Sequence, residues 1–243
     1  MHSQRLDTEA NKNKLLTMLE QTAAVNFDVI VLPELWATGF YPAEAVNFAH
    51  DADNLQKFLS ELARRHNAYV VGGSVVSGRG DAVYNTCFCF NRQGELLSAY
   101  DKIHLFSPTG EDKYFAHGDK INLFDIEGIT CGTAICYDLR FPELMREMSA
   151  QEAKIIFLPA QWPKLRLNHW RILNQARAVE NQIFLAAANG AGKSLAGHSM
   201  LVSPWGDILT EGGEAEGVFT ATINPDDLVS AREKINVWRD RRL

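Results

Sequence analysis

The sequence predicts an α/β fold in which helices cover mixed β-sheets. Segments with helical spacing of apolar residues alternate along the chain with short apolar runs that are typical of buried strands. Several consecutive strand-like runs are joined by turn sequences, so some neighbouring strands are expected to form hairpins. The chain has 243 residues, 46% of them hydrophobic, and no low-complexity linker divides it. We therefore expect one domain over residues 1–243 with a substantial core.

The N-terminal half is predicted to contain two amphipathic helices and four strands. Leu15 and Leu19 lie one helical turn apart, and Leu55, Leu59 and Leu62 repeat that spacing further along. The run FDVIVLPE is almost continuously apolar, as expected of a strand buried on both faces, and RQG is typical of a hairpin turn. The expected elements are a helix over residues 8–24, a strand over 27–34, a helix over 54–66, and strands over 68–76, 82–91 and 95–103.

The C-terminal half is predicted to continue the alternation of strands and helices. The dipeptide EG joins two strand-like runs. Pro142 fits the first turn of a helix, where its missing N–H costs little, and Asp138 is a candidate cap for the same helix. The expected elements are strands over residues 121–126 and 129–138, a helix beginning with 141–148, a strand over 154–160, a helix over 167–181, strands over 182–189, 198–205, 207–212 and 217–223, and a short helix from Pro225.

The composition argues against several classes of protein. The net charge is −6 and no basic cluster is interleaved with aromatic residues, which argues against nucleic-acid binding. The longest apolar runs are far shorter than the ~20 residues that a membrane-spanning helix needs. The four cysteines lack the CxxC spacing of a structural zinc site, and the N-terminus lacks the apolar segment of a secretion signal. We expect a cytoplasmic protein with no membrane or nucleic-acid partner.

Glu34 is the first candidate catalytic residue. It ends the run FDVIVLPE, and the ends of strands hold the reactive side chains of many α/β proteins. Its neighbours Leu32, Leu35 and Trp36 would partly desolvate the carboxyl group and raise its pKa toward the range of a general base. The segments DVIVLPELW and KIIFLPAQW share the order of strand, Leu-Pro and Trp. That similarity indicates either coincidence or two similar units that open on one site.

Lys102 and His104 are rival candidates at the end of the strand expected over residues 95–103. Apolar and aromatic neighbours favour a fixed cation at Lys102 over a solvated one. In a continuing strand, alternation would place both side chains on the same face. The residues by themselves therefore do not choose between a lysine and a histidine.

Cys136 is the strongest candidate nucleophile. It comes at the end of a strand-like run, just before a predicted helix, unlike Cys87, Cys89 and Cys131. Amide dipoles at the N-terminus of a helix stabilise a thiolate, so we expect the pKa of Cys136 to be lowered. The backbone N–H of Tyr137 is a candidate donor to a developing oxyanion.

The segments LPELWATGFYP, YDKIHLF and ICYDLRFPEL, in this order, resemble the nitrilase superfamily of carbon–nitrogen hydrolases. The resemblance extends through GEDKYFAHGD, FLPAQWP, HWRILNQARAVENQIFLAAAN and GHSMLVSPWGDIL. It implies a four-layer αββα sandwich, a homodimer or larger homo-oligomer, and no metal or organic cofactor. Members begin with a strand ahead of their first helix. Residues 1–7 are too short and too polar to supply it, so we expect this first strand to be lacking, either because the chain start is truncated or because this member has no such strand.

The resemblance also implies a catalytic triad, which falls on Glu34, Lys102 and Cys136, and a second glutamate, which falls on Glu111 of GEDKYF. Cys136 would attack an amide carbonyl and form a thioester. Lys102 and the N–H of Tyr137 would stabilise the oxyanion, and Glu34 would transfer the protons. Glu111 would orient Lys102 and the substrate.

Within the superfamily, the segments QWP, HW and GHS…PWG look most like those of ω-amidases, which hydrolyse the terminal amide of 2-oxo acids such as 2-oxoglutaramate. Such a substrate carries a carboxylate, so we expect a cation in the pocket, with Arg140 and Arg166 as candidates. A structural salt bridge is the alternative for each arginine. The aromatic residues that could line a small pocket are Trp36, Phe40, Tyr41, Tyr114 and Trp162.

Three alternatives remain open at this point. The same triad would serve an N-carbamoyl-amino-acid hydrolase, a deaminated-glutathione amidase or a nitrilase. A Cys–His hydrolase would instead pair Cys136 with His104 or His169. A catalytically silent scaffold of the same fold is the non-enzymatic alternative, although a scaffold has no physical need for the triad and Glu111 together.

Overall fold

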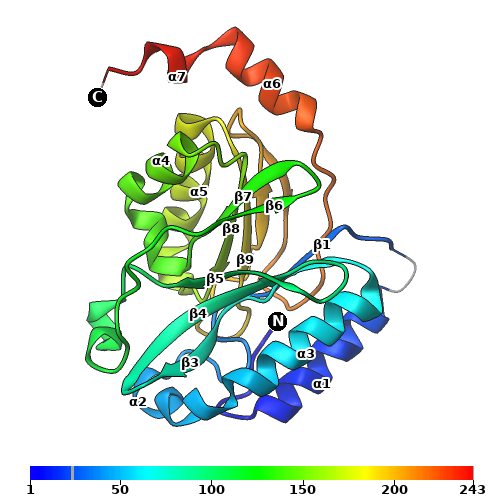
Figure 1. Ribbon diagram of the computed structural model, residues 1–243, viewed down its shortest axis with the longest axis vertical. Coiled ribbons are helices and arrows are strands. Elements are labelled where there is room, and N and C mark those ends of the chain that lie inside the picture. The colour runs from blue at the N-terminus through cyan, green and yellow to red at the C-terminus, as the bar shows by residue number, and fades with distance from the viewer. Residues whose placement is uncertain (23–24, 243) are drawn as a thin grey trace.

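Two β-sheets face each other in the computed structural model, which describes residues 1–22 and 25–242. Helices α1 (Thr8–Glu20) and α3 (Ala52–His66) cover the outer face of the first sheet (Figure 1). Helices α4 (Pro142–Ala150) and α5 (Leu167–Asn181) cover the outer face of the second sheet. The fold class predicted from the sequence, an αββα sandwich, is confirmed.

The first sheet has the strand order β1-β2-β4-β3, and β5 also pairs with β4. β1 and β2 are parallel, with Val29 opposite Tyr69, whereas the pairs that involve β4 are antiparallel. The strands are β1 (Val29–Val31), β2 (Tyr69–Val71), β3 (Val75–Arg79), β4 (Ala82–Phe90) and β5 (Leu96–Asp101).

The second sheet has the order β11-β10-β9-β8-β7-β6. Its central pairs β7–β8 and β8–β9 are parallel, and the outer pairs are antiparallel. The strands are β6 (Leu123–Ile126), β7 (Ile129–Thr133), β8 (Ile155–Ala160), β9 (Phe184–Asn189), β10 (Met200–Val202) and β11 (Ile208–Glu211).

None of the helices within residues 1–22 and 25–242 is long and apolar enough to cross a membrane.

Short helices connect the strands and long helices, and two more in the described part of the chain come after the last strand. The remaining elements are α2 (Pro42–Ala45), α6 (Pro225–Lys234) and α7 (Val237–Asp240), and the 3₁₀ helices η1 (Val46–Asp51), η2 (Ser107–Thr109), η3 (Glu111–Lys113), η4 (Cys136–Arg140) and η5 (Lys164–Arg166).

The apolar core has two main parts, which follow from the burial patterns of the strands. Cys87, Cys131 and Phe157 belong to the larger cluster, which fills the space between the sheets. Leu59 and Phe88 belong to a second cluster beneath α1 and α3. Successive residues of β4 therefore contribute to opposite faces of its sheet, as expected of a strand buried on both sides.

The strand expected over residues 68–76 is divided into β2 and β3 at Gly72 and Gly73. Gly73 has φ +66°, and a Cβ at this position would lie 2.1 Å from the carbonyl oxygen of Pro33. Glycine is therefore required for the bend. The bend brings Ser74 to the end of β1, where its Oγ accepts the N–H of Leu35 at 3.0 Å. It thus fixes the chain directly after Glu34.

Two other expected strands differ from the structure. The strand over residues 129–138 ends at Thr133, because the chain turns into η4 at Cys136. Residues 217–223 do not join a sheet, since no strand of the described residues pairs with them. A groove of about 620 Å³ lies beside this segment and β1, which is at the edge of its sheet. The expectation that a first strand is lacking stays a prediction.

The ends of two helices also differ from expectation. α1 ends at Glu20 rather than continuing to residue 24, and residues 23 and 24 lie outside the described chain. Pro142 does occupy the first turn of α4, but Phe141 rather than Asp138 precedes that turn. The carboxylate of Asp138 accepts the N–H of Ile135 instead, and so stabilises η4. Asp138 therefore closes the turn that carries Cys136.

Candidate active site

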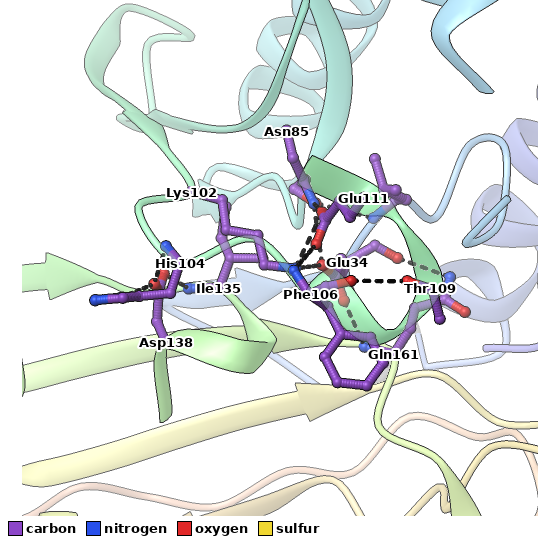
Figure 2. Close-up of polar contacts among 12 residues, drawn as sticks. Glu34, Asn85, Lys102, His104, Phe106, Thr109, Glu111, Ile135, Asp138 and Gln161 are labelled. Carbon is purple, nitrogen blue, oxygen red and sulfur yellow. Dashed lines mark hydrogen bonds and ion pairs between the residues drawn. The ribbon is translucent and has the colours of Figure 1, made fainter. Parts of the chain in front are cut away.

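Four side chains from separate parts of the chain meet between the sheets. Glu34 follows β1, Lys102 follows β5, Glu111 begins η3 and Cys136 begins η4. The first three are fully buried, and Cys136 is 9% exposed. Figure 2 shows the carboxylates of Glu34 and Glu111 next to each other, both joined to the Lys102 ammonium by dashed lines. The structure therefore places together the residues expected from the sequence.

The Lys102 ammonium joins the two carboxylates. Its Nζ donates to Glu34 Oε1 at 2.7 Å and to the two oxygens of Glu111 at 3.1 and 2.9 Å. These groups are enclosed by protein, so water screens their interaction weakly. The cation is held in a fixed position by the two carboxylates.

Three further donors complete this cluster, and sequence reasoning missed them. Asn85 Nδ2 donates to Oε1 of both Glu34 and Glu111, at 3.0 Å each. The backbone N–H of Gln161 donates to Glu34 Oε2 at 3.0 Å, and that of Phe106 to Glu111 Oε2 at 2.6 Å. Asn85 could have been found from the sequence, because it is a polar residue that alternates with the inward-facing cysteines of β4 and so lies on the same face of the strand. Backbone donors leave no such signal.

Burial and charge set the proton affinities of this cluster. Desolvation raises the pKa of Glu34 above its ordinary value, an effect that Lys102 opposes and Glu111 reinforces. Desolvation works against the ammonium of Lys102, but Glu34 and Glu111 outweigh it, and the pKa of Lys102 is raised. The lysine is therefore a permanent cation, and Glu34 is a stronger base than an exposed glutamate.

Cys136 has a strained backbone, with φ +47° at the first residue of η4. The expectation that its pKa is lowered is wrong. Burial raises the pKa of the thiol well above its ordinary value, and the neighbouring Glu34 carboxylate adds to that effect, while Lys102 opposes it. Desolvation outweighs the helix dipole because η4 is a short 3₁₀ turn enclosed by the core. Cys136 is thus a protonated thiol beside a base, Glu34, that can accept its proton.

His104 lies apart from the Lys102 ammonium. β5 ends at Asp101, so the strand alternation that would have placed the two side chains on one face does not extend to them. His104 Nδ1 contacts Asp138 Oδ1 at 2.8 Å, and its ring stacks on Phe141 with 3.6 Å between ring centroids. His169, the other candidate histidine, contacts Arg140. The contacts of His104 are those of a residue that supports η4.

Cys136 opens into a cavity of about 300 Å³. Tyr137, Arg140 and Arg166 line this cavity together with Tyr41 and Trp162. Two of the aromatic residues expected here lie elsewhere: Trp36 is in the core beneath α1 and α3, and Tyr114 is 44% exposed at the surface. Phe40 does line the cavity, as expected.

The guanidinium groups of the two arginines in the cavity pack on aromatic rings and do not pair with carboxylates of the described residues. The Arg140 guanidinium lies 4.8 Å from the centroid of the Trp162 ring, and that of Arg166 lies 5.7 Å from the Phe106 ring. Within residues 1–22 and 25–242, neither forms an ion pair with an aspartate or glutamate. Over the same residues, no cluster of three or more His, Cys, Asp or Glu side chains is arranged to hold a metal ion.

The two similar segments of the sequence do open on one site. The N–H of Glu34 donates to the carbonyl of Ala160 at 3.4 Å, and Gln161 Nε2 donates to the carbonyl of Glu34 at 2.8 Å. The ends of β1 and β8, one from each sheet, are thereby joined across the inter-sheet space. A base, a cation and a thiol at the floor of a cavity can together perform nucleophilic acyl transfer.

Comparison with known proteins agrees with this chemistry. The 2-oxoglutaramate amidase of Bacillus subtilis is 40% identical over 220 residues, which are 88% of this chain and 85% of that protein. XC1258 of Xanthomonas campestris, a CN-hydrolase superfamily protein solved with an arsenic adduct in its active site, is 29% identical with a TM-score of 0.94, over 100% of this chain and 94% of that one.

An amidase from Nesterenkonia sp. AN1, solved with acrylamide added to its active-site cysteine, is 26% identical with a TM-score of 0.86, over 97% of this chain and 95% of that one. The carbon-nitrogen hydrolase family model matches residues 1–233. With that match over nearly the whole chain, and with the same fold and a buried Glu, Lys and Cys at one site, the protein belongs to the carbon–nitrogen hydrolase family.

Proposed function

We propose that the protein hydrolyses the terminal amide of a small 2-oxo dicarboxylic acid monoamide of the 2-oxoglutaramate type and releases ammonia. The observation that carries this proposal is the buried Glu34–Lys102 pair beside Cys136, which lines a cavity that also presents two arginines. The name of the Bacillus subtilis relative supports the same substrate class. The reaction is an amide hydrolysis through a thioester.

The first half of the reaction forms the thioester. Glu34 accepts the proton of Cys136, and the sulfur attacks the amide carbonyl. The negative charge that develops on the carbonyl oxygen is stabilised by Lys102 and by the backbone N–H of Tyr137. Collapse of the tetrahedral intermediate breaks the C–N bond, and Glu34 gives its proton to the departing nitrogen as ammonia.

The second half hydrolyses the thioester. Glu34, now ionised again, removes a proton from a water molecule that attacks the same carbonyl carbon. Collapse breaks the C–S bond, yields the carboxylic acid and returns the proton to Cys136. Glu111 holds Lys102 in place through both halves, since its two oxygens lie 3.1 and 2.9 Å from the ammonium.

The charge of the cavity favours a substrate with a free carboxylate. Arg140, Arg166 and Lys193 line it, and no aspartate or glutamate is among the described residues that do so. Arg166 is the better candidate for the carboxylate, because Arg140 already contacts both Trp162 and His169. The ring of Trp162 would then pack against the carbon chain of the substrate.

Ammonia release from a panel of amides tests the proposal. The panel contains 2-oxoglutaramate, other ω-amides, carbamoyl amino acids and simple nitriles, with Cys136→Ala as the control. We expect the highest kcat/KM for the carboxylate-bearing ω-amides and no release by the control. A preference for carbamoyl amino acids or nitriles would assign another substrate class. Activity that survives in the control would contradict the thioester route.

Arg166→Gln tests the contact with the carboxylate. A charge-assisted hydrogen bond contributes about 1.5–3 kcal/mol, so KM for 2-oxoglutaramate is expected to rise about 10–100-fold. KM for a neutral amide such as butyramide should change less than about 3-fold, because it has no carboxylate to lose the contact. An equal rise for both amides would show that Arg166 shapes the cavity rather than binding the acid.

Alkylation tests the exposure and activation of Cys136. Iodoacetamide at low excess should label Cys136 before the other cysteines, because it lines the cavity beside a base. Cys87, Cys89 and Cys131 are at most 1% exposed and lie in the core between the sheets. Peptide mapping by mass spectrometry identifies the first labelled residue. Earlier labelling of another cysteine would contradict this arrangement.

We also propose that the protein acts in the cytoplasm as a homodimer or larger homo-oligomer. Exposed apolar residues on α5 support self-association, since Ile172 is 55% exposed and Val179 is 44% exposed. Trp205, in the turn before β11, is a third exposed apolar side chain. Light scattering after size-exclusion chromatography measures the mass, and Ile172→Glu should lower it. A monomeric mass for the parent protein would contradict the proposal.

A further inference from the structure

Asn85 occupies a position between the two carboxylates of the site. It lies on β4, is fully buried, and its Nδ2 is 3.0 Å from Oε1 of Glu34 and 3.0 Å from Oε1 of Glu111. Figure 2 shows the amide on the same side of both carboxylates as Lys102. The two hydrogens of one amide group thus serve two acids that also share a cation.

The orientation of this amide has a cost that indicates its role. The Oδ1 of Asn85 is buried and has no hydrogen-bond partner among the described residues. The reverse orientation would place that oxygen against two carboxylate oxygens, which repel it. The observed orientation leaves the amide oxygen unpaired and gives both N–H groups to the acids.

The donors around Glu34 are distributed unequally between its two oxygens. Oε1 accepts from both Lys102 and Asn85, whereas the backbone or amide donor to Oε2 within residues 1–22 and 25–242 is the N–H of Gln161. A carboxylate oxygen accepts about two hydrogen bonds, so Oε1 is saturated. An ammonium and an amide NH₂ group cannot accept, so a proton on Oε1 would have no partner. Oε2 is the oxygen of Glu34 that is free to take up a proton.

Glu111 differs in this respect. Its Oε1 accepts from Lys102 and Asn85, and its Oε2 accepts from Lys102 and from the N–H of Phe106. Both oxygens therefore already accept two hydrogen bonds each. Two carboxylates so close together would otherwise share a proton, as paired acids do. The amide of Asn85 stands where that shared proton would lie.

We propose that Asn85 is a positioning residue: it keeps a proton from being shared between Glu34 and Glu111, and it directs the proton from Cys136 to Oε2 of Glu34. The proposal deepens the proposed function and rests on it, since it assigns the atom of Glu34 that acts as the base. The proton moves from Cys136 Sγ to Glu34 Oε2 and from there to the leaving nitrogen, so none is gained or lost.

Loss of the amide should change the pH dependence of the site. The titratable groups that act on Glu34 are Lys102, Glu111 and Cys136. Without the Asn85 donors the two acids can share a proton, and the pKa of Glu34, already raised by burial, rises further. The acidic limb of activity, where Glu34 loses its proton, then moves to higher pH.

The test uses Asn85→Leu, which keeps the size of the side chain and removes the donors. We expect the acidic limb of kcat/KM to move up by about one pH unit or more, kcat to fall about 10–100-fold, and KM to stay within about 3-fold. The rate of alkylation of Cys136 by iodoacetamide should show the same shift. Alkylation needs no substrate, so a protein that releases no ammonia but shows this shift contradicts the proposed function and supports the inference.

Asn174→Leu is the matched control. Asn174 is also fully buried, donates through Nδ2 to the carbonyl of Trp170 at 2.8 Å, and has an unpaired Oδ1, but it lies on α5 away from the carboxylates. We expect it to lower stability without moving the acidic limb. If Asn85→Leu does not fold, Asn85→Ser retains one donor and should shift the limb by a smaller amount. An unshifted limb in the folded Asn85 variant overturns the inference.

Discussion

Replacing Lys102 by methionine is expected to lower kcat/KM by at least about 10³-fold and to destabilise the protein by roughly 3–5 kcal/mol near neutral pH. Methionine has a similar length and no charge. The variant loses the cation that faces the oxyanion, and it leaves two buried carboxylates with neutral donors only. Because Lys102 is fully buried, water cannot replace the ammonium.

The loss of stability should depend on pH in a defined direction. In the parent, the raised pKa of Lys102 means that its stabilisation is fully present below the ordinary lysine value of 10.5 and is lost only as the pH rises further. In the variant, the pKa of Glu34, already raised by burial, loses the opposing effect of Lys102 and rises further above its unfolded value. Stability is then lost as the pH rises through that range, so the variant should be closer to the parent at pH ~5 than at pH ~8.

Urea denaturation of parent and variant at both pH values measures this effect. Lys164→Met is the control, because Lys164 forms an ion pair with Glu214 at 2.7 Å in which the two side chains are 50% and 58% exposed. An exposed pair of this kind contributes little to stability, because water screens the attraction between its charges. If the Lys102 variant is as stable as this control at both pH values, the stability of the fold does not depend on the pairing of the buried carboxylates with Lys102.

Most elements of the fold were predictable because burial is encoded in local patterns. The helix over residues 167–181 and the strand expected over 154–160 correspond closely to α5 and β8, whose apolar residues repeat at the expected spacing. The strand expected over 217–223 has the same kind of pattern and yet joins no sheet of the described residues. Its state depends on a partner strand, which a local pattern does not contain.

The bend at Gly72 and Gly73 was missed for a related reason. Glycine in a strand-like run is compatible with a continuous strand, and only the approach of the Pro33 carbonyl makes the bend necessary. That approach also positions Glu34. The sequence could therefore indicate that a reactive group follows β1 but not how its backbone is held.

The candidate site was predictable in its residues and less so in its electrostatics. Glu34, Lys102 and Cys136 were recognisable because each follows an apolar run within a distinctive segment. The pKa of Cys136 was expected to be lowered by nearby amide dipoles, whereas burial and Glu34 raise it. Burial comes from segments distant in sequence, so the dominant cause was absent from the local pattern.

Asp138→Ala is expected to destabilise the protein by roughly 3–5 kcal/mol and to lower kcat by at least about 10²-fold. Its buried carboxylate accepts four contacts: Oδ2 from Tyr100 OH at 2.7 Å and Ile135 N–H at 2.8 Å, and Oδ1 from His104 N–H at 3.0 Å and Nδ1 at 2.8 Å. Each buried donor left without its charged acceptor costs about 1–3 kcal/mol, partly offset by relaxation.

Activity is lost because the contacts of Asp138 join the turn that carries Cys136 to the segment that follows Lys102. Asp138 closes η4, in which Cys136 has its strained φ of +47°, and it also holds the segment that follows Lys102 through His104. Without it, neither the thiol nor the ammonium is fixed relative to the other, and displacements of about 1 Å cost about 10²-fold in rate. Thermal unfolding and steady-state kinetics on the same preparation measure both effects.

His104→Ala separates this support from catalysis by histidine. It removes one contact of Asp138 and the stacking on Phe141 but retains the backbone donor, so we expect a loss of activity of at most about 10-fold. A Cys–His hydrolase would instead lose at least about 10³-fold activity with its base. A His104 variant more impaired in kcat than Asp138→Ala, with unchanged stability, would therefore transfer the role of base from Glu34 to the histidine.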